Sequence, residues 1–142
     1  GWDPVGHYDE DRFDIDLVEK VECALKQKGG AVVLKDYPVE AAALSRRKPE
    51  QPQVAERWEL YIDGIELANA YSELTDCAEQ RRRFEECAVR RREMGKADYG
   101  IDEAFMRALD QMPNAGGVAL GVDRLLMLMT GNSSLEPLLP FR

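Results

Sequence analysis

The sequence predicts an α+β domain built on an antiparallel β-sheet that is flanked by helices. One observation is the alternation of apolar and polar residues at 57–74, which Asp63-Gly64, a pair typical of hairpin turns, interrupts. Another is that the helical patterns lie before and after this hairpin and do not alternate with single strands. Such segregation favours an α+β domain over an alternating parallel sheet.

The first part of the chain predicts a loop, a helix and a strand. Residues 1–9 carry Gly, Pro and Asp without a period and without an initiator methionine, so we expect a loop or a cut end. Apolar residues then recur at helical spacing before two glycines that end the helix: Phe13, Leu17, Val21, Leu25, Gly29 and Gly30. The short β-branched segment 31–38 ends in Pro, which predicts a buried strand up to Tyr37.

The remaining elements follow from their boundary residues. Segment 46–53, with two prolines and several charges, predicts an exposed connection before the hairpin. Asp76 and Glu79 resemble a capping box at the start of a long charged helix that stops at Gly95. We expect a further helix at 101–111, a turn-rich loop at 112–117, a short strand at 118–120 and a helix at 122–130. The last helix carries four apolar residues that we expect in the core: Leu125, Leu126, Leu128 and Met129.

Composition excludes several classes of protein. The chain has 142 residues, 44% of them hydrophobic and 32% charged, as in one globular domain or a part of one. The net charge of -8 argues against general electrostatic binding of nucleic acid. The arginines at 81–83 and 90–92 are interleaved with acidic residues, which is typical of a solvated helix face. Three cysteines without paired spacing and a lone His7 argue against structural zinc. Without a membrane-length apolar run or a basic leader, we expect a cytoplasmic protein and no membrane partner.

Several polar residues of the hairpin are candidates for binding a ligand. Asn69, Tyr71 and Glu73 are spaced by two, so on a regular strand they project to one side. An amide, an aromatic wall and a carboxylate suit a ligand with an ammonium group, but polar residues of a solvated sheet face would show the same pattern. Glu59 and Glu66 could hold Mg²⁺ bound to phosphates, although two exposed glutamates would look the same.

The last helix carries a cation where its dipole disfavours one. Arg124 lies in the first turn, so we expect it to have an anionic partner. A nucleotide phosphate is one candidate, and the neighbouring Asp123 is the other.

Two segments resemble a known family. Residues 57–76, RWELYIDGIELANAYSELTD, and 116–131, GGVALGVDRLLMLMTG, resemble the catalytic core of class II lysyl-tRNA synthetases, and the second corresponds to motif 3. The likeness is closer to the lysyl-tRNA-synthetase-like lysyltransferases of elongation factor P, known as the GenX or PoxA family. The resemblance covers the chain from about Phe13 to Arg142. It implies that residues 1–142 are the C-terminal portion of a class II synthetase-type catalytic domain.

The resemblance implies ATP and Mg²⁺ as cofactors and a role for individual residues. Arg124 takes the place of the motif 3 arginine that contacts the γ-phosphate of ATP. Glu59 and Glu66 match the glutamates that hold Mg²⁺ near the ATP phosphates. By this resemblance, Arg124 and Glu66 would be catalytic. The amino-acid pocket would comprise Asn69, Tyr71 and Glu73, with Glu73 pairing with substrate ammonium groups. Gly121 and Gly117 would let the backbone approach the nucleotide or the amino acid.

Two further expectations concern the shape of this pocket. Lysyl-tRNA synthetases typically have a glycine where this chain has Ala119, and the elongation factor P enzymes resemble this chain there. A methyl group is worth about 1–3 kcal/mol of discrimination, so the preference could shift toward (R)-β-lysine. Glu66 and Asn69 are three residues apart, so a regular strand places them on opposite faces, and a shared pocket requires a bulge near 67–69.

In the family reaction the amino-acid carboxylate attacks the α-phosphate of ATP, and the resulting aminoacyl adenylate passes its acyl group to an acceptor. The acceptor would be a lysine of elongation factor P, or tRNA if the chain is a piece of a lysyl-tRNA synthetase. A second alternative is a non-catalytic synthetase-like binding module.

No segment resembles motifs 1 and 2, so we expect no pyrophosphate exchange by this chain alone. The homodimer expected of a full-length parent would form through a region that is not represented here.

Overall fold

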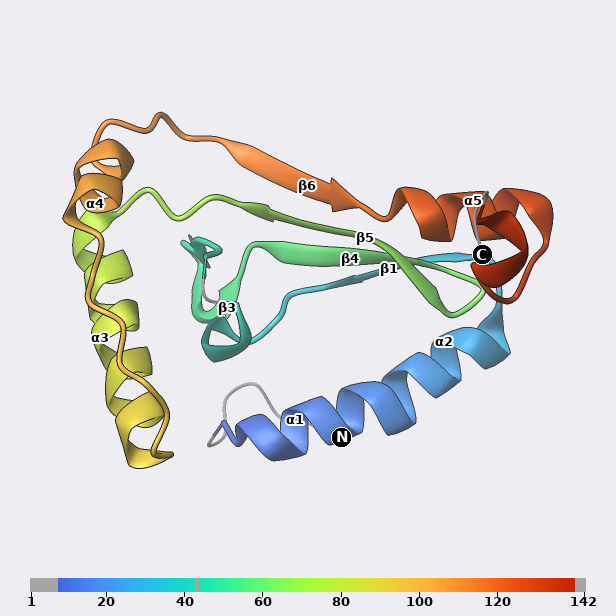
Figure 1. Cartoon of the computed structure of the whole chain (residues 1–142), viewed down its shortest axis with the longest axis horizontal. Coiled ribbons are helices and arrows are strands. Elements are labelled where there is room, and N and C mark those ends of the chain that lie inside the picture. The colour runs from blue at the N-terminus through green and yellow to red at the C-terminus, as the bar shows by residue number, and fades with distance from the viewer. Residues whose placement is uncertain (1–7, 43, 140–142) are drawn as a thin grey trace.

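An antiparallel four-stranded sheet forms the centre of the computed structural model, which describes residues 8–42 and 44–139. The strands lie in the order β1-β4-β5-β6, where β1 is Ala31–Lys35, β4 is Arg57–Ile62, β5 is Ile65–Ser72 and β6 is Gly116–Leu120. Helices flank this sheet, as Figure 1 shows. The α+β prediction is therefore confirmed. Residues 1–7 of the expected N-terminal loop, including His7, lie outside the described residues.

The hairpin of β4 and β5 turns at Asp63-Gly64, as the sequence predicts. Both residues have positive φ, 50° and 78°, the combination that a two-residue turn between twisted strands requires. A Cβ at Gly64 would lie 2.5 Å from the Cβ of Lys26, so the turn also demands glycine for lack of space. The Asp63 carboxylate accepts a 2.7 Å hydrogen bond from the backbone N–H of Gly30. These contacts attach the hairpin tip to the end of the preceding helix.

Strand β5 carries the expected bulge. Leu60 lies opposite Ala68, whereas Tyr61 lies opposite Glu66, so Leu67 is the extra residue. The insertion moves Glu66 onto the face that also holds Asn69, because side chains otherwise alternate between faces. The prediction of an irregularity near 67–69 is confirmed.

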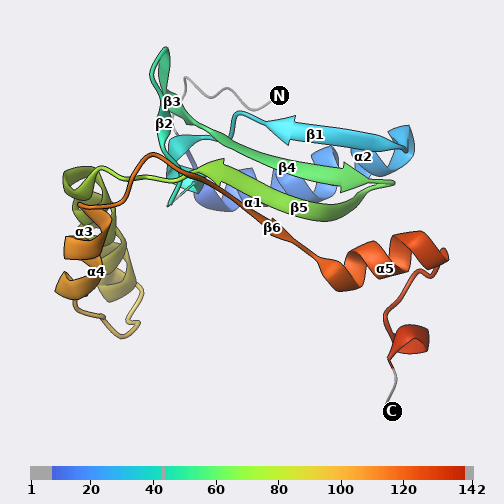
Figure 2. The same ribbon diagram turned by 90° about the horizontal axis from the view of Figure 1, so that it is seen from above.

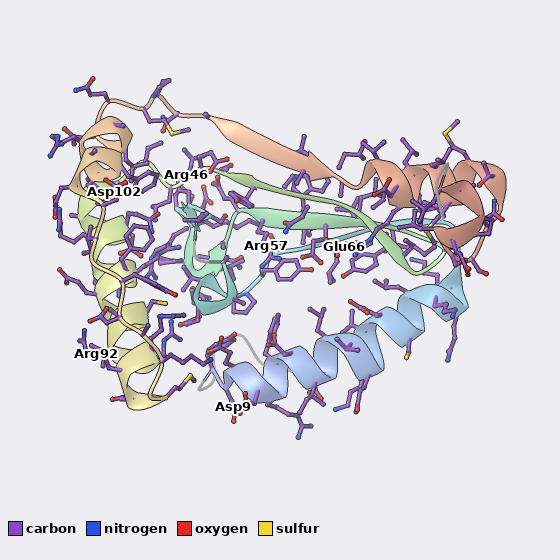
Figure 3. The ribbon with its side chains drawn as sticks, viewed as in Figure 1. Asp9, Arg46, Arg57, Glu66, Arg92 and Asp102 are labelled. Atoms are coloured by element: carbon purple, nitrogen blue, oxygen red, sulfur yellow. The ribbon has the colours of Figure 1, made fainter. Side chains whose placement is uncertain are left out.

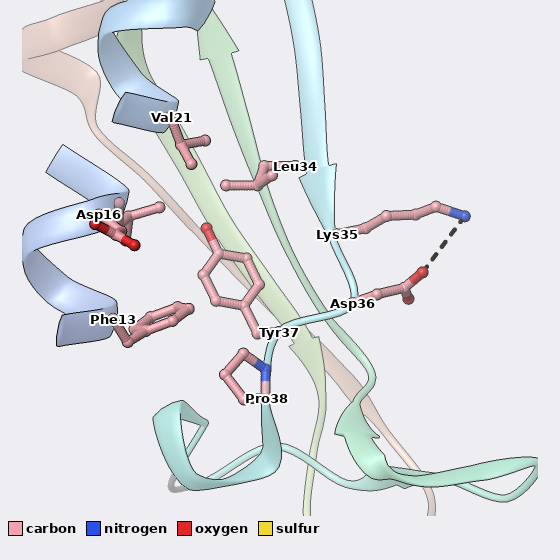
Figure 4. Close-up of a pocket in the computed structure, with 9 residues that line it drawn as sticks. Phe13, Asp16, Val21, Leu34, Lys35, Asp36, Tyr37 and Pro38 are labelled. Carbon is pink, nitrogen blue, oxygen red and sulfur yellow. Dashed lines mark ion pairs between the residues drawn. The ribbon is translucent and has the colours of Figure 1, made fainter. Parts of the chain in front are cut away.

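One long helical segment covers this face of the sheet. It comprises α1 (Glu10–Asp16), a π-helical turn η1 (Leu17–Glu22) and α2 (Cys23–Lys28). Figure 2 shows this segment crossing behind the strands. Leu17 and Val21 line an apolar cavity of about 160 Å³ together with Leu34 of β1 and Tyr37. Figure 4 shows Val21, Leu34 and Tyr37 around it. The predicted amphipathic helix is confirmed, and its apolar stripe faces the sheet.

The segments on either side of Tyr37 differ from the prediction. Strand β1 is an edge strand rather than a buried one: its residues alternate between exposed and half-buried, and Val33 is 55% exposed because only the opposite face is covered. It also ends at Lys35, before Tyr37. The exposed connection expected at 46–53 instead contains a small hairpin of β2 (Arg47–Lys48) and β3 (Gln51–Ala55), after the 3-10 turn η2 (Val39–Ala41). The end of β3 is buried, at Val54 and Ala55.

Two helices pack at one end of the sheet (Figure 1), α3 (Cys77–Glu93) and α4 (Glu103–Leu109). Asp76 caps α3 as predicted, but the reciprocal half of the expected capping box is absent, because Glu79 binds Arg47, Arg82 and Arg83 instead of the Asp76 N–H. Gly95 follows the helix with a φ of +67°. Arg81, Arg82 and Arg92 of α3 pair with carboxylates at the surface, which agrees with the predicted solvated face. The prediction is wrong for Arg83, whose side chain is 9% exposed and donates to the backbone carbonyl oxygens of Ala42 and Ser45.

Helix α5 (Val122–Thr130) extends from the other end of β6, ahead of the 3-10 turn η3 (Glu136–Leu138). Leu126 and Met129 are 42% and 76% exposed, so their predicted place in the core is wrong, while Leu125 and Leu128 are half-buried. The helix contacts the sheet along one side only, which leaves its other apolar residues uncovered. Among the described helices, we find none with the length and apolar content needed to cross a membrane.

Candidate functional site

The expected site residues form a row on the helix-covered face of the sheet. Residues paired across neighbouring strands share a face. The register pairs Glu59 with Asn69 and Asn69 with Ala119, and it pairs Arg57 with Tyr71 and Tyr71 with Gly117. The bulge adds Glu66, opposite Tyr61. Arg57 and Glu66 are both labelled in Figure 3, on the side of the strands that faces α1.

At one end of the row, Arg124 contacts Glu66. One guanidinium N–H group donates to the backbone carbonyl oxygen of Glu66 at 2.6 Å and to its carboxylate at 3.0 Å. The anionic partner of Arg124 is therefore Glu66 rather than Asp123. Half of the Arg124 side chain remains exposed, as does 35% of the Glu66 side chain. Both groups are thus within reach of a further ligand.

Gly121 holds the start of α5 against the bulge. Its backbone N–H donates to the carbonyl oxygen of Leu67 at 2.9 Å. A Cβ at this position would lie 3.4 Å from Cδ of Arg124, at the limit of ordinary van der Waals contact. The Arg124 side chain thus passes close to the Gly121 backbone as it reaches Glu66.

At the other end of the row, the carboxylate of Glu73 lies over Gly117. A Cβ on Gly117 would meet Oε1 of Glu73 at 2.5 Å, so only glycine leaves room for the carboxylate in this position. The backbone N–H of Glu73 donates to Ala115 at 2.9 Å, which fixes the residue beside the start of β6. Within residues 8–42 and 44–139, the Glu73 carboxylate accepts no hydrogen bond and forms no ion pair. It is therefore available to a cationic ligand.

Glu59, in the middle of the row, is 5% exposed and fully engaged. One carboxylate oxygen accepts hydrogen bonds from the hydroxyls of Tyr37 and Tyr61, the latter at 2.8 Å. The other oxygen accepts a 2.6 Å bond from the Arg57 guanidinium. Burial, together with the hydrogen bonds to Glu59, raises the pKa of Tyr37 and of Tyr61 above that of a free tyrosine.

Arg57 connects this buried carboxylate to the predicted pocket. Its Nε–H donates to Oδ1 of Asn69 at 3.2 Å, and another N–H donates to the carbonyl oxygen of Ala41 at 2.5 Å. Its guanidinium carbon lies 4.4 Å from the centroid of the Tyr37 ring. Arg57, Tyr37 and Tyr61 were not among the site residues predicted from the sequence. The period of two that links Arg57, Glu59 and Tyr61 was a signal that could have found two of them.

The structure thus brings the predicted residues together in three groups along one face. Glu66 joins Arg124, Asn69 lies beside Ala119 and is linked to Glu59 through Arg57, and Glu73 lies over Gly117. Glu66 is near the start of β5 and Glu73 follows its last residue, so the two carboxylates lie at opposite ends of the strand.

The two candidate Mg²⁺ ligands differ in how well they fit a cation. Glu66 is partly exposed and has one carboxylate oxygen, Oε1, without a partner among the described residues. Glu59 is buried, and both of its oxygens accept hydrogen bonds. Within the described ranges, no group of three or more His, Cys, Asp or Glu is arranged for a metal ion. Mg²⁺ is commonly held by one or two carboxylates together with substrate phosphates, a mode that Glu66 fits and Glu59, as placed here, does not.

The fold agrees with the family comparison. The family described as tRNA synthetases class II (D, K and N) matches residues 8–142. The chain therefore belongs to this family of class II synthetases.

The chain is similar to lysine-specific members of that family. It is 45% identical over 107 residues to a lysine–tRNA ligase of Thermosynechococcus vestitus. This alignment covers 75% of this chain and 21% of the ligase. The chain is 44% identical over 115 residues to an elongation factor P–(R)-β-lysine ligase of Avibacterium paragallinarum, covering 80% of this chain and 36% of that protein. A lysine–tRNA ligase of Prochlorococcus marinus is 44% identical over 108 residues, again 75% of this chain and 21% of the relative. The chain thus spans only about a fifth to a third of these relatives.

Proposed function

We propose that this chain forms part of a site that activates lysine or (R)-β-lysine with ATP and Mg²⁺, and that the acyl group passes to a lysine of elongation factor P. The observation that carries the proposal is the Glu73 carboxylate, which Gly117 accommodates and which has no cationic partner in the described part of the chain. A substrate ammonium group would supply the missing charge. Arg124, at the other end of the row, offers a guanidinium to an anionic group.

Each group in the row has a role in this reaction. Arg124 would contact the γ-phosphate of ATP with the N–H groups that Glu66 does not use. Glu66 would hold Mg²⁺, which neutralises phosphate charge when it is bound. Glu73 would bind the side-chain ammonium of the substrate, with Tyr71 as an aromatic wall. No side chain needs to act as a nucleophile, because the substrate carboxylate attacks the α-phosphorus of ATP and pyrophosphate leaves. The protein aligns the reactants and stabilises charge.

Ala119 supports the elongation factor P reading over a lysine–tRNA ligase. It pairs with Asn69 and is exposed on the face that carries the row, so its methyl group occupies space that a glycine would leave to the ligand. The tRNA alternative is supported by the lysine–tRNA ligases, which match this chain as closely as the elongation factor P ligase does. A non-catalytic binding module is the third candidate. It gives no account of a phosphate-directed arginine and an ammonium-directed carboxylate on the same face.

Two chimeras test the proposal. The aligned segment of the Avibacterium ligase, and that of the Thermosynechococcus ligase, would each be replaced by the corresponding residues of this chain. ATP–pyrophosphate exchange would then be measured with L-lysine and with (R)-β-lysine. We expect both chimeras to catalyse exchange and to share a preference for (R)-β-lysine, because the pocket comes with this chain.

Ala119→Gly is the matched control for the pocket. It should move both chimeras toward L-lysine by roughly 10-fold, the size expected for one methyl group. Folded chimeras that show no exchange with either amino acid, while both unmodified hosts remain active, would refute the proposed function. A preference that follows the host instead of the inserted chain would refute the role of Ala119. Transfer of the acyl group would be assayed separately with the protein that contains this chain. Elongation factor P and tRNA would each be supplied to that protein as the acceptor.

A further inference from the structure

We infer that Arg57 is a positioning residue, which orients Asn69 so that its amide nitrogen, and not its oxygen, faces the bound ligand. The inference rests on the proposed function for the identity of the ligand, but the orientation of Asn69 follows from the structure alone. Among the described residues, the Asn69 side chain has no hydrogen-bond partner other than Arg57.

The chemistry of the two groups determines which way the amide points. A guanidinium has only donors, whereas the end of an asparagine side chain carries one acceptor and one double donor. The atom of Asn69 that lies 3.2 Å from Nε of Arg57 must therefore be the oxygen, because two donors would repel each other. A rotation of the Asn69 amide by half a turn would place two N–H groups against an arginine.

Arg57 is itself held in place from four sides. Besides Asn69, its guanidinium donates to the Glu59 carboxylate and to the backbone of Ala41, and it lies over the Tyr37 ring. Glu59 in turn accepts both tyrosine hydroxyls. A buried polar network whose groups are all satisfied is rigid, because any movement leaves a donor or an acceptor without a partner. The position of Asn69 is thus set by the network of Tyr37, Tyr61, Glu59 and Arg57 on the helix-covered face of the sheet.

The free end of Asn69 is consequently a donor. Within the described residues its Nδ2 atom donates to no acceptor, and the side chain is half-buried beside the exposed Ala119. A group that presents two N–H bonds donates to a carboxylate or phosphate oxygen of a ligand and offers nothing to an ammonium. Asn69 and Glu73 therefore have opposite preferences. Asn69 takes the carboxylate end of a zwitterionic amino acid and Glu73 takes its distant ammonium.

The same network assigns a different role to Glu59 from the one expected. Its carboxylate is buried in the middle of the row and contacts Arg57 directly, so it acts through Arg57 rather than on a metal ion. Glu59→Gln would leave the tyrosine contacts possible but weaken the charged bond that holds Arg57.

Nuclear magnetic resonance of the wild-type chain tests the arrangement. We expect scalar coupling across the hydrogen bond from the Nε–H of Arg57 to the side-chain amide of Asn69. We further expect L-lysine to shift the Asn69 side-chain N–H resonances, whereas cadaverine, which is lysine without its carboxylate, shifts only resonances near Glu73. The binding preference for L-lysine over cadaverine should be at least 10-fold in the wild type and near unity in Arg57→Gln.

Two further variants separate positioning from a general loss of structure. Arg57→Lys keeps the charge but not the fork of donors, so it should fold, keep binding cadaverine and lose most of the preference for lysine. Arg46→Gln is the matched control, because Arg46 binds Glu56 and Asn114 and does not touch Asn69. It should retain the preference.

The outcomes distinguish this inference from the proposed function. Absence of the Arg57–Asn69 coupling in the folded chain would overturn the inference. So would equal shifts of the Asn69 amide by lysine and cadaverine. If the coupling is present but neither compound shifts any resonance, the orientation of Asn69 stands and the proposed substrate class is refuted.

Discussion

The guanidinium of Arg124 binds Glu66 twice, at its backbone carbonyl oxygen and at its carboxylate, although the two residues are 58 positions apart. This pair attaches the first turn of α5 to the bulged part of β5. Because half of the Arg124 side chain is exposed, solvent screens the ion pair and it adds little to stability. The exposure leaves both side chains open to the ligand that we propose they share.

Arg124→Ala should separate function from stability. In this chain, the free energy of unfolding should fall by about 1 kcal/mol or less, because the ion pair is exposed. In either chimera, ATP–pyrophosphate exchange should fall by roughly 100-fold or more, since a donor aimed at transition-state charge is lost. The matched control is Arg107→Ala, which removes an exposed arginine from α4. Equal activity of the two variants would show that Arg124 does not contact the nucleotide.

Gly117→Ala should disturb the position of Glu73 while the fold persists. The added Cβ would lie 2.5 Å from Oε1 of Glu73, so the carboxylate has to move. Glutamate is flexible, and we expect a loss of stability below about 1 kcal/mol. The KM for lysine in the chimeras should rise by roughly 10-fold or more. The control is Gly116→Ala, whose Cβ would meet only the carbonyl oxygen of Tyr71, at an ordinary 3.6 Å. An unchanged KM for Gly117→Ala would contradict the role of Glu73.

Glu79 should make the chain sensitive to acid. Burial opposes its ionisation, but hydrogen bonds from Arg82, Arg83 and Arg47 outweigh burial and lower the pKa of Glu79 from 4.5 to about 2. Its contribution to stability is thus fully present above pH 4.5 and is lost as the pH falls toward 2.

Thermal unfolding of Glu79→Gln at a series of pH values measures this contribution. The variant should be less stable than the wild type by roughly 1.5–3 kcal/mol at neutral pH, the range for hydrogen bonds to charged groups, and the difference should shrink below pH 4.5. Glu85→Gln, at an exposed position of the same helix, is the control. A difference between Glu79→Gln and the wild type that stays constant with pH would contradict the lowered pKa.

Tyr37 and Tyr61 should remain protonated in alkaline solution for as long as the chain is folded. Burial and the bonds to Glu59 raise the pKa of both above the ordinary value of 10.0. Because the unfolded chain loses these protons more readily, their contribution to stability is present below pH 10.0 and declines above it.

A spectrophotometric titration of phenolate formation tests this expectation. We expect part of the absorbance change to appear only when the chain unfolds. Tyr37→Phe should reduce this late change by one tyrosine and leave the earlier change intact. The free energy of unfolding should fall by about 1–3 kcal/mol, because Glu59 loses one hydrogen-bond donor. If the substitution instead reduces the earlier change, Tyr37 is not shielded.

Much of the fold was accessible from local pattern. The turn at Asp63-Gly64, the apolar stripe of the first helix and the cap at Asp76 each depend on neighbours a few residues away. The bulge in β5 was predicted from a functional requirement, that Glu66 and Asn69 share a face, and the register confirms it. Two of the errors concern burial. The edge position of β1 and the exposure of Met129 depend on what packs against each element, which no short window of sequence contains.

By itself, the sequence determined the helices, the hairpin and the resemblance to lysine-specific class II synthetases, because periodicity, turn residues and motif letters are local properties. The tertiary structure alone decided that Arg124 pairs with Glu66 rather than Asp123, and that Arg57 lies between Glu59 and Asn69. The physical reason is that such pairs require both the register of distant strands and the docking of a helix over them. Polar atoms brought together in this way must find partners among whichever groups the folded chain places within reach.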